Sequence, residues 1–491
     1  MRKGAIMLQG AGSNVGKSVL VAGLCRLFAN QKVNVAPFKP QNMSNNAAVT
    51  IDGGEIGRAQ ALQARACYLA PHTDMNPVLL KPETDTGAQV IVQGKRFGSM
   101  RAREYGAQKS ALLPPVLESF NRLHEAHDLV IIEGAGSPAE VNLRAGDIAN
   151  MGFAEAADVP VVMIGDIDRG GVIASLVGTD KVLDEADAAR IKAFMINKFR
   201  GDTSLFHDGM TIIEQATGWQ GVGILPWFPG ASKLPAEDIL DLSAKARSGA
   251  DKLIHIAVPV LRRIANFDDL DPLAGEAQVR LTLVNEGEAL PGDADLILLP
   301  GSKATISDLA YIRTQGWDID IAAHIRRGGH VVGLCGGYQM LGQMVHDPEG
   351  IEGPAGSAQG LGFLDIETTL EGRKIVTDTT GISVPEGLPV RGYEIHMGRT
   401  SGPDCERPMV MIETKSGMIP DGACDKSGRV RGCYMHGLFA EDSYRAALFK
   451  ALGGNEAVSH FDALIEDELD KLARHLDSHL DIDKLAKIAE L

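Results

Sequence analysis

A glycine-rich loop close to the N-terminus constrains the fold of this chain more than any other feature. Residues 10–18 read Gly-Ala-Gly-Ser-Asn-Val-Gly-Lys-Ser. The apolar residues 4–9 before the loop predict a buried strand, and residues 20–28 after it place their large apolar side chains on one face of a helix. A strand, a glycine turn and a helix N-terminus in this order direct several backbone N–H groups at one anion. The segment therefore predicts a phosphate-binding loop in a parallel α/β sheet.

The same loop contains the side chains that nucleotide chemistry needs. Lys17 can reach the β- and γ-phosphates, and the Ser18 hydroxyl can ligate Mg²⁺. The strict motif has glycine where Ala11 stands, with Gly10 one position earlier. This variant resembles the loop of dethiobiotin synthetases, whereas partition ATPases of the same superfamily carry a lysine at the position of Ala11. The predicted ATP-binding residues of the loop are Gly12, Asn14, Gly16, Lys17 and Ser18.

Two residues further along the chain complete the predicted nucleotide site. Glu133 ends an apolar run and precedes a glycine turn, where a carboxylate can hold Mg²⁺ directly or through water. A carboxylate that only caps the strand is the alternative. Asn197 resembles the asparagine with which this superfamily reads adenine, although asparagine after a strand is also common in turns. The predicted cofactors are ATP and Mg²⁺, with Ser18 and Glu133 as the metal-binding residues.

Polar segments follow other predicted strands, at the edge where open α/β sheets bind ligands. They cover residues 39–46, 52–58 and 165–171. Their side chains can hold anionic groups of a substrate, although solvated surface charges are an equal alternative for the basic ones. The candidate substrate-binding residues are Lys39, Asn42, Ser44, Arg58 and Arg169.

A second candidate active site lies in the C-terminal half. Residues 330–341 combine an apolar strand, the sequence Gly-Leu-Cys-Gly-Gly and the start of a helix. Glycines around Cys335 permit the sharp turn of a nucleophile elbow, with cysteine in the place of serine. A helix N-terminus stabilises a thiolate, and backbone N–H groups such as that of Gly336 can form an oxyanion hole. Cys335 is therefore the predicted nucleophile.

A thiol nucleophile needs a base, and His436 is the leading candidate. It follows a predicted strand and precedes a glycine, a position from which a base can project into an active site. His396 is the second candidate. In class I glutamine amidotransferases the histidine stands two residues before a glutamate that orients it, but here that position is Leu438. The sequence thus supports a Cys–His pair with an unidentified orienting group.

Short apolar runs alternate with helical patterns along both halves of the chain, which predicts an α/β fold with two domains. In the N-terminal half the expected strands are residues 4–9, 34–37, 129–133, 159–165, 191–197 and 221–225. The predicted divisions are a P-loop domain with a parallel sheet, similar to dethiobiotin synthetase (1–235); a linker with a short helical piece at 239–246 (236–250); a class I-like glutamine amidotransferase domain (251–445); and a helical tail whose leucines recur at helical spacing (446–491).

Composition excludes several classes of function. The 491 residues include 48 Lys and Arg and 64 Asp and Glu, a net charge of −16. An acidic surface repels phosphate backbones, so we expect no nucleic-acid partner. The apolar runs are far shorter than the roughly 20 residues of a membrane helix, so we expect no membrane partner. Six cysteines without a Cys-x-x-Cys pair and no recognisable signal peptide predict a cytoplasmic protein.

Seven motifs in a characteristic order resemble one family. They cover residues 10–18, 37–44, 52–63, 75–82, 133–136, 392–398 and 434–439. Together, up to about residue 445, they resemble the cobyric acid synthase family of cobalamin biosynthesis. The resemblance implies ATP- and glutamine-dependent amidation of the b, d, e and g side chains of adenosylcobyrinate a,c-diamide through acyl phosphates, with ammonia from glutamine hydrolysis at Cys335. It aligns Cys335 and His436 with the family's pair and implies that the missing glutamate is a family trait. The implied partners are glutamine and a corrinoid polycarboxylate, and the oligomeric state is not predicted.

The sequence leaves three rival functions open. Cobyrinate a,c-diamide synthases share the two-domain plan but amidate other carboxylates, and the segment at residues 38–44 favours the first family. A P-loop regulatory ATPase with an inactive amidase domain does not need the intact Cys335 and His436. A cysteine peptidase leaves the ATP site without a purpose.

Overall fold

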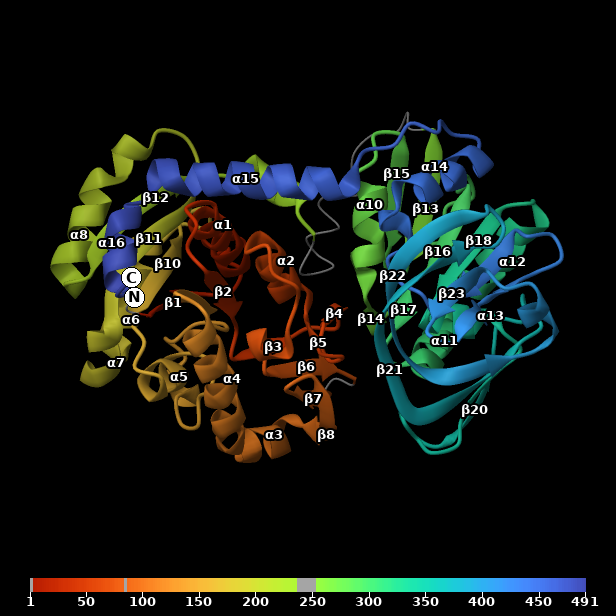
Figure 1. Cartoon of the computed structure of the whole chain (residues 1–491), viewed down its shortest axis with the longest axis horizontal. Helices are drawn as coiled ribbons and strands as arrows, with labels where there is room; N and C mark the ends of the chain where they lie inside the picture. The colour runs from red at the N-terminus through yellow and green to blue at the C-terminus, as the bar shows by residue number, and fades with distance from the viewer. Residues whose placement is uncertain (1–2, 84–85, 236–252) are drawn as a thin grey trace. The chain divides into compact units, whose positions relative to one another are not determined.

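The computed structural model describes residues 3–83, 86–235 and 253–491 (Figure 1). Among these residues the chain forms two compact units. The first comprises Met1–Ser44, Thr50–Leu234 and Ile465–Leu491, and the second comprises Asn45–Val49 and Pro235–Leu464. The units are therefore not the contiguous ranges that the sequence suggested, because residues 465–491 belong to the first unit and Asn45–Val49 to the second. The expected linker at 236–250 and its helical piece lie outside the described residues.

The main sheet of the first unit is parallel throughout, with the strand order β12-β11-β10-β1-β9-β2. Its strands are β1 (Gly4–Gly10), β2 (Val35–Phe38), β9 (Leu129–Glu133), β10 (Val161–Asp166), β11 (Ile191–Phe199) and β12 (Gln220–Pro226). All six confirm runs expected from the sequence. Because β1 lies between β9 and β10, the loop that follows it opens near the centre of the carboxyl edge, and Glu133 at the end of β9 lies beside Leu8.

Helices fill most connections between these strands, as parallel pairing requires. They are α1 (Lys17–Asn30), α2 (Arg58–Ala66), α3 (Ala102–Gln108), α4 (Leu113–Ala126), α5 (Met151–Ala156), α6 (Val172–Val182), α7 (Glu185–Arg190) and α8 (His207–Thr217). A small sheet that the sequence did not predict has the order β3-β6-β7-β8. It contains β3 (Gln41–Met43), β6 (Val78–Pro82), β7 (Gly87–Val92) and β8 (Lys95–Arg101). Two further short strands are β5 (Glu55–Gly57) in the first unit and β4 (Ala47–Val49) in the second.

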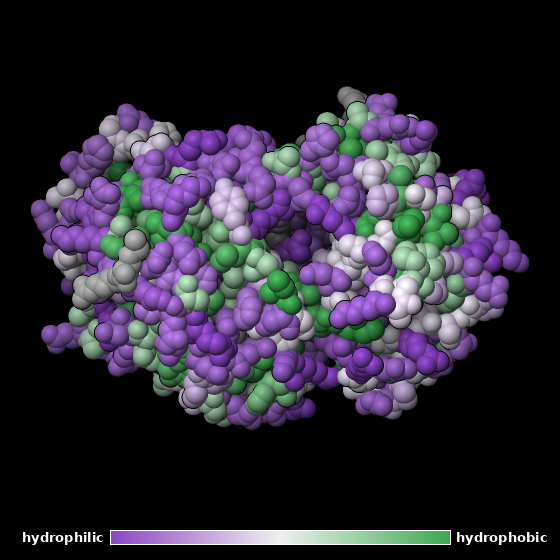
Figure 2. Space-filling model, in the orientation of Figure 1, coloured by the Kyte–Doolittle hydropathy of each residue, from purple (hydrophilic) through white to green (hydrophobic). Residues whose placement is uncertain are grey.

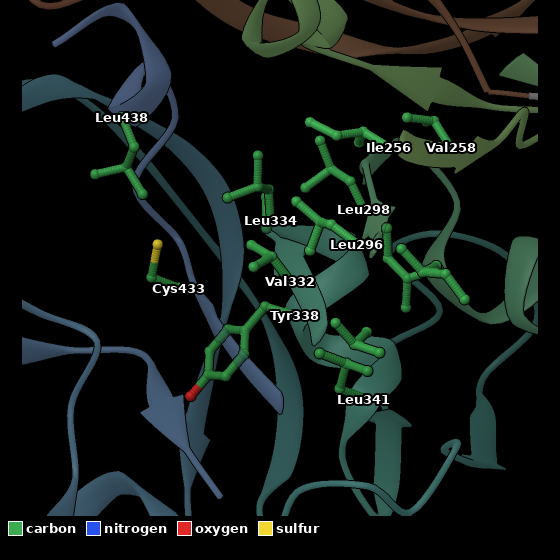
Figure 3. Packing of buried hydrophobic residues seen from close by; sticks show 14 of the residues in the cluster. Ile256, Val258, Leu296, Leu298, Val332, Leu334, Tyr338, Leu341, Cys433 and Leu438 are labelled. Carbon is green, nitrogen blue, oxygen red and sulfur yellow. The ribbon is translucent and has the colours of Figure 1, made fainter. Parts of the chain in front are cut away.

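The second unit is built on a sheet with the order β15-β13-β16-β18-β26-β25, in which only the edge strand β25 is antiparallel. Its strands are β13 (Ile254–Pro259), β15 (Val279–Val284), β16 (Leu296–Leu299), β18 (His330–Leu334), β25 (Ala423–Cys424) and β26 (Val430–Cys433). Among the described residues, the helices of this unit include α10 (Asp271–Ala274), α11 (Thr305–Thr314), α12 (Trp317–Arg326), α13 (Gly336–Leu341) and α14 (Asp442–Ala451). Buried side chains from β13, β16 and β18 pack together beneath the start of α13 (Figure 3). This core supports the predicted nucleophile turn.

A second, largely antiparallel sheet extends from the same unit. It contains β19 (Met344–Asp347), β20 (Gly356–Gln359), β21 (Glu367–Ser383), β22 (Leu388–Ser401), β23 (Val410–Thr414) and β24 (Gly417–Asp421), and a separate pair joins β14 (Ile264–Ala265) to β17 (Gly301–Ser302). The long hairpin of β21 and β22 dominates this sheet. Tyr393 of β22 forms an isolated antiparallel bridge with His436, so the hairpin reaches the predicted base.

Two helices end the chain, α15 (Phe461–His479) and α16 (Ile482–Ile488). From Ile465 onward they pack on the first unit. Leu472 and Leu476 are buried, and a Cβ on Gly23 of α1 would lie 2.5 Å from the Leu476 Cδ1 atom. The backbone N–H of Ala5 donates to the Ala489 carbonyl at 3.0 Å. The apolar stripe in this tail therefore serves intramolecular packing.

The surface of the molecule on the face drawn in Figure 2 is mainly hydrophilic, with hydrophobic residues in small patches. Within the described ranges, every helix is too short or too polar to cross a membrane.

Candidate active sites

The loop between β1 and α1 closes around Lys17. Gly16, the N-cap residue immediately before α1, has φ 96°, and Asn14 has φ 58°, so the loop uses residues that tolerate the left-handed conformation. The Lys17 ammonium donates to the carbonyls of Gly136 at 3.1 Å and Gly12 at 3.4 Å. The structure thus brings the predicted loop residues and the turn after β9 together.

Asn197 also lies at this loop. Its amide Nδ2 donates to the carbonyl of Val15 at 2.8 Å, and a Cβ on Gly16 would lie 2.5 Å from that nitrogen. The neighbouring Lys198 donates to the Asn14 carbonyl and to the Asp166 carboxylate. Asn197 and Lys198, near the end of β11, therefore contact the loop from the side of the sheet opposite β9 and Glu133.

Glu133 is the centre of a buried polar cluster in the first unit. Its side chain is 1% exposed and accepts four side-chain hydrogen bonds. The donors are Lys39 Nζ at 2.7 Å, Ser18 Oγ at 2.8 Å, Gln63 Nε2 at 2.6 Å and Gln60 Nε2 at 3.3 Å. Burial alone would raise the pKa of Glu133, but Lys39 and the other donors hold it below its ordinary value. Glu133 is therefore an ionised carboxylate.

The donor set at this cluster fits a hard cation. The Ser18 hydroxyl and the Glu133 carboxylate are oxygen ligands 2.8 Å apart beside the phosphate loop. In the part of the chain that the structure describes, no group of three or more His, Cys, Asp or Glu side chains could hold a metal. A Mg²⁺ ion at Ser18 and Glu133 would thus need further oxygens from nucleotide and water.

The candidate substrate residues are distributed unevenly around this cluster. Lys39 is 5% exposed and paired with Glu133, and Asn42 donates to the Gln60 Oε1 atom at 2.8 Å, so both lie in the buried network. The Ser44 backbone N–H donates to the carbonyl of Leu80, in β6 of the small sheet, at 2.9 Å. Arg58 begins α2, and Arg169 is exposed in the loop after β10. Gln60 and Gln63 are contacts that sequence reasoning missed, although they stand on α2 only two and five residues after Arg58.

Cys335 has the backbone of a nucleophile elbow. It joins β18 to α13 with φ 50° and ψ −109°, a conformation that non-glycine residues rarely adopt. The next two residues must be glycine, since a Cβ on Gly336 would lie 2.8 Å from the Ser302 nitrogen and one on Gly337 would lie 2.2 Å from the Leu299 carbonyl oxygen. The turn that the sequence predicted is therefore present, with its strain at the nucleophile.

His436 pairs with Cys335 and is completely buried. Its Nδ1 atom lies 2.7 Å from the Asp269 Oδ2 atom, and the Asp269 Oδ1 atom accepts from the Gly437 N–H at 2.6 Å. Burial disfavours the imidazolium, but Asp269 and the hydrogen bond with Cys335 outweigh burial and raise the pKa of His436 to about 10. Asp269 occupies the place of the orienting group that the sequence did not identify.

The short helix η6 (Phe267–Leu270) supplies this carboxylate. Asp269 stands 167 positions before His436, so no local spacing could reveal the pair. The available signal is two adjacent acidic residues in an apolar stretch, both buried in the structure. The neighbouring Asp268 accepts from the Tyr393 hydroxyl at 2.8 Å, and the Tyr393 ring stacks on His436 with a centroid distance of 5.2 Å. The imidazole is thus held on its edge and on one face.

His396, the second candidate base, is used differently. Its ring stacks on Tyr434 with centroids 3.8 Å apart, and its Nε2 atom lies 3.4 Å from Glu394. It is His436 that shares hydrogen bonds with Cys335 and Asp269.

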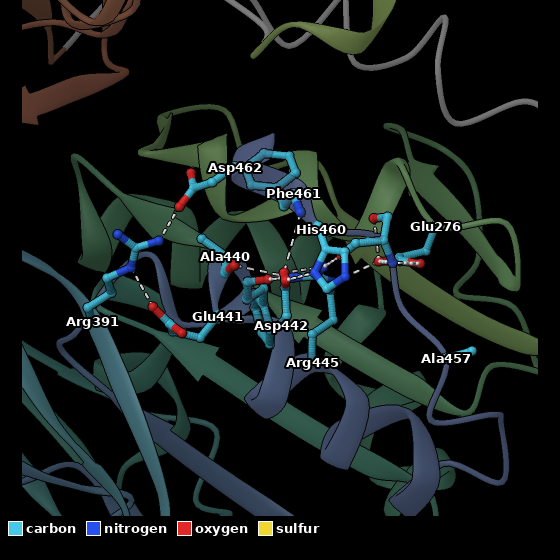
Figure 4. A network of polar contacts seen from close by, with 12 residues as sticks. Glu276, Arg391, Ala440, Glu441, Asp442, Arg445, Ala457, His460, Phe461 and Asp462 are labelled. Carbon is cyan, nitrogen blue, oxygen red and sulfur yellow. Dashed lines mark hydrogen bonds and ion pairs between the residues drawn. The ribbon is translucent and has the colours of Figure 1, made fainter. Parts of the chain in front are cut away.

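An arginine network fixes the chain that follows His436 (Figure 4). The fully buried Arg445 donates to the carbonyls of Phe439 at 2.6 Å and Ala440 at 3.3 Å, and to Glu276 at 2.8 Å. Arg391, next to the strand residues that bridge to His436, pairs with Glu441 and Asp462. These contacts hold both backbone segments that position the imidazole.

The class of protein follows from these two sites together with comparison to known families. Residues 6–241 match the CobQ/CobB/MinD/ParA nucleotide binding domain, and residues 255–444 match the CobB/CobQ-like glutamine amidotransferase domain. The chain is therefore an ATP- and glutamine-dependent amidotransferase.

Relatives of known family extend over almost the whole chain. A cobyric acid synthase from Jannaschia sp. (strain CCS1) is 61% identical over 484 residues, which cover 99% of both chains. One from Paracoccus denitrificans (strain Pd 1222) is 61% identical over 99% of this chain and 100% of its own, and one from Bradyrhizobium diazoefficiens is 58% identical over 99% of both. The chain belongs to the cobyric acid synthase family, the glutamine amidotransferases of cobalamin biosynthesis. The resemblance seen in the sequence is confirmed, and the three rival functions are not supported.

Proposed function

We propose that this chain amidates the b, d, e and g carboxylates of adenosylcobyrinate a,c-diamide with ammonia released from glutamine. The observation that carries the proposal is the buried Cys335–His436–Asp269 constellation in a chain that matches cobyric acid synthases along 99% of its length. The phosphate loop with Lys17 and Glu133 supports the ATP-dependent half of the reaction.

Glutamine hydrolysis is assigned to the second unit. The Cys335 thiolate attacks the side-chain amide carbon of glutamine, and the His436 imidazolium gives its proton to the departing ammonia. Asp269 keeps the proton of Nδ1 in place and stabilises the charged imidazole. Backbone N–H groups at the elbow, with that of Gly336 among them, stabilise the oxyanion. Water then hydrolyses the thioester, with His436 as base, and releases glutamate.

Carboxylate activation is assigned to the first unit. Lys17 and the loop residues Gly12, Asn14 and Gly16 hold the phosphates, and Asn197 contacts the adenine. Ser18 and Glu133 would hold Mg²⁺, which neutralises charge on the transferring phosphoryl group. A substrate carboxylate attacks the γ-phosphorus to give an acyl phosphate and ADP, and ammonia then displaces phosphate to leave the amide. Lys39, Asn42, Ser44, Arg58 and Arg169 are proposed to contact the corrinoid.

The decisive experiment counts amides. Purified protein, ATP, Mg²⁺ and glutamine are incubated with adenosylcobyrinate a,c-diamide, and mass spectrometry follows the product. Conversion of four carboxyl groups into amides is the expected result. Each conversion changes the mass by about −1 Da, because an OH group is replaced by the slightly lighter NH₂ group. No amidation of the diamide contradicts the proposal, and so does amidation of the a and c carboxylates in a parallel incubation with cobyrinate.

Asp269→Asn should reduce glutamine hydrolysis by about 10²–10⁴-fold, because the amide no longer stabilises the imidazolium. Without the carboxylate, burial lowers the pKa of His436, since burial already opposes the charged form in the native chain. The pH at which glutamate release falls off, as His436 loses its proton, should therefore be lower in this variant than in the wild type. Asp268→Asn, a buried neighbour whose Oδ1 contacts Tyr393, is the matched control and should lose much less. Equal losses in the two variants would remove Asp269 from its proposed role.

Ser18→Ala should raise the Mg²⁺ concentration for half-maximal ammonia-dependent amidation by roughly tenfold or more, because one metal ligand is lost. The change removes a hydroxyl of little volume and leaves Lys39 and Glu133 paired. Ser13→Ala in the same loop is the control, since Ser13 is exposed. An unchanged Mg²⁺ requirement in Ser18→Ala would exclude the hydroxyl as a ligand.

We further propose that the protein acts in the cytoplasm without a nucleic-acid or membrane partner. All six cysteines are free, as is usual in a reducing compartment. The proposed working division is a synthetase unit with its helical C-terminal tail and a glutaminase unit, joined near residues 236–250.

A further inference from the structure

The chain that leads to His436 leaves its sheet before it reaches the base. Strand β26 ends at Cys433, and its pairing with the edge strand β25 has already ended at Gly432. The next two residues, Tyr434 and Met435, are nevertheless buried, with exposures of 7% and 0%. A buried backbone N–H without an acceptor costs free energy, so these two groups need acceptors from outside the sheet.

Asp421 supplies both acceptors. Its two carboxylate oxygens accept from the Tyr434 N–H at 3.1 Å, and its Oδ2 atom also accepts from the Met435 N–H at 3.1 Å. The next two N–H groups along the chain donate to the Tyr393 carbonyl at 2.8 Å and to Asp269 at 2.6 Å. Four consecutive N–H groups around the base are therefore held, the first two of them by Asp421.

The backbone of Asp421 belongs to a different sheet from the strand whose end it caps. Asp421 ends β24 and is paired with Val410 of β23. Gly422 then turns the chain into β25 with φ 81°, and a Cβ on this glycine would lie 2.1 Å from the Gly432 carbonyl oxygen. Asp421 thus joins the antiparallel sheet of the second unit to the end of β26.

The carboxylate is held here at a cost to stability. Asp421 is 8% exposed, and among the described residues no lysine, arginine or histidine side chain pairs with it. Burial and the nearby Glu394 raise the pKa of Asp421 to about 7, although three backbone N–H groups oppose that rise. A buried carboxylate without a counter-charge is expected where it serves a function.

Tyr434 connects this cap to the nucleophile. Its hydroxyl accepts from the Gln339 Nε2 atom at 3.2 Å. Gln339 lies on α13, one turn after Cys335, whose carbonyl accepts from the Gln339 N–H at 3.0 Å. Asp421 therefore holds the backbone of Tyr434 while α13 holds its side chain. His436, two positions later, is placed relative to the thiol by both contacts.

We propose that Asp421 is a positioning residue for glutamine hydrolysis, which keeps the His436 imidazole within reach of the Cys335 thiol through the backbone of Tyr434 and Met435. Without this carboxylate the two N–H groups lose their acceptor, and the segment that carries the base shifts. Thiol and base then lose the alignment on which proton transfer depends. The inference rests on the proposed function, since it concerns the hydrolysis assigned to Cys335 and His436.

Asp421→Asn tests the proposal, because it keeps the size of the side chain but turns one acceptor oxygen into an NH₂ group. The kcat of glutamine hydrolysis should fall on the order of 10²-fold, and the KM for glutamine should stay within about twofold of the wild type. Ammonia-dependent amidation should persist, because the synthetase residues belong to the other unit.

A second readout does not depend on glutamine. Iodoacetamide reacts with the thiolate, so labelling of Cys335, followed by peptide mass spectrometry, reports whether His436 still takes the thiol proton. Labelling should slow roughly tenfold in Asp421→Asn, because the base is displaced. General destabilisation would not slow the labelling of a buried cysteine. Wild-type kcat and labelling in this variant would overturn the proposal, whatever its thermal stability.

Asp347→Asn is the matched control. Asp347 is 1% exposed in the same unit and accepts from the backbone N–H groups of Ile351 at 2.7 Å and Glu352 at 2.9 Å. A carboxylate with a purely structural role affects thermal stability alone, so this variant should keep the wild-type kcat and labelling rate. Equal falls of kcat in the two variants would also contradict a specific role for Asp421.

Tyr434→Phe tests the same alignment from the side of α13. It removes the hydroxyl that contacts Gln339 and Thr400 and leaves the bonds to Asp421 in place. Its kcat should fall roughly tenfold with little change in KM. If Asp421→Asn does not fold, this variant decides, and a wild-type kcat overturns the proposal. Failure of the proposed function is a different result, because the wild type would then release no glutamate and form no amide.

Discussion

Cys335→Ala should abolish glutamine-dependent amidation while ammonia-dependent amidation continues. Only the thiol can form the thioester, so we expect a loss of about 10³-fold or more with glutamine as the nitrogen source. Ammonia added to the solution bypasses hydrolysis, and the synthetase residues around Lys17 belong to the other unit. Product formation with each nitrogen source, measured on the same preparation, checks the expectation.

The substitution is structurally mild at this position. It removes one sulfur atom, and the glycines that form the turn remain. Cys424→Ala is a suitable control because Cys424 is also buried in the second unit but lies on the edge strand β25. It should retain activity with both nitrogen sources. Loss of the ammonia-dependent reaction in Cys335→Ala would contradict the division of labour between the units.

Lys17→Ala should remove amidation with either nitrogen source. The ammonium is held by the Gly12 and Gly136 carbonyls at the phosphate loop, and its charge is needed where the γ-phosphoryl group transfers. We expect a fall of about 10²-fold or more in ammonia-dependent turnover, and ADP release should fall with it. Basal glutamine hydrolysis without acceptor should stay near the wild-type rate.

Lys192→Ala is the matched control, since Lys192 is an exposed lysine on β11 of the same unit. Its ammonia-dependent turnover should be that of the wild type. Normal turnover in Lys17→Ala would rule out the phosphate role and would leave the loop as an ordinary turn.

Local sequence was sufficient where a function depends on neighbouring residues. The loop at 10–18 and the elbow at Cys335 each consist of a strand, glycines and a helix start, so their backbone geometry is encoded within about ten residues. The structure confirms both turns, and the six strands expected in the first unit form its parallel sheet. His436 could be predicted as the base because a histidine at a strand end is a local pattern.

Partners that come from distant parts of the chain were not identifiable in this way. Asp269 reaches His436 across 167 positions, and Gln63 reaches Glu133 across 70. Lys39 was predicted to contact an anionic substrate group, and only the fold revealed that it also pairs with Glu133 and has little exposure. Each of these contacts depends on which strands become neighbours, which a local pattern does not specify.

The sequence alone therefore identified the family to which this protein belongs and predicted its two chemistries, phosphate binding and thiol attack. Only the tertiary structure decided how the groups are charged and held. It placed a carboxylate on His436, four donors on Glu133, residues 465–491 in the first unit and Asn45–Val49 in the second. The physical reason is that ionisation and orientation of a buried group depend on all atoms within a few ångströms, and most of those atoms belong to residues far away in the chain.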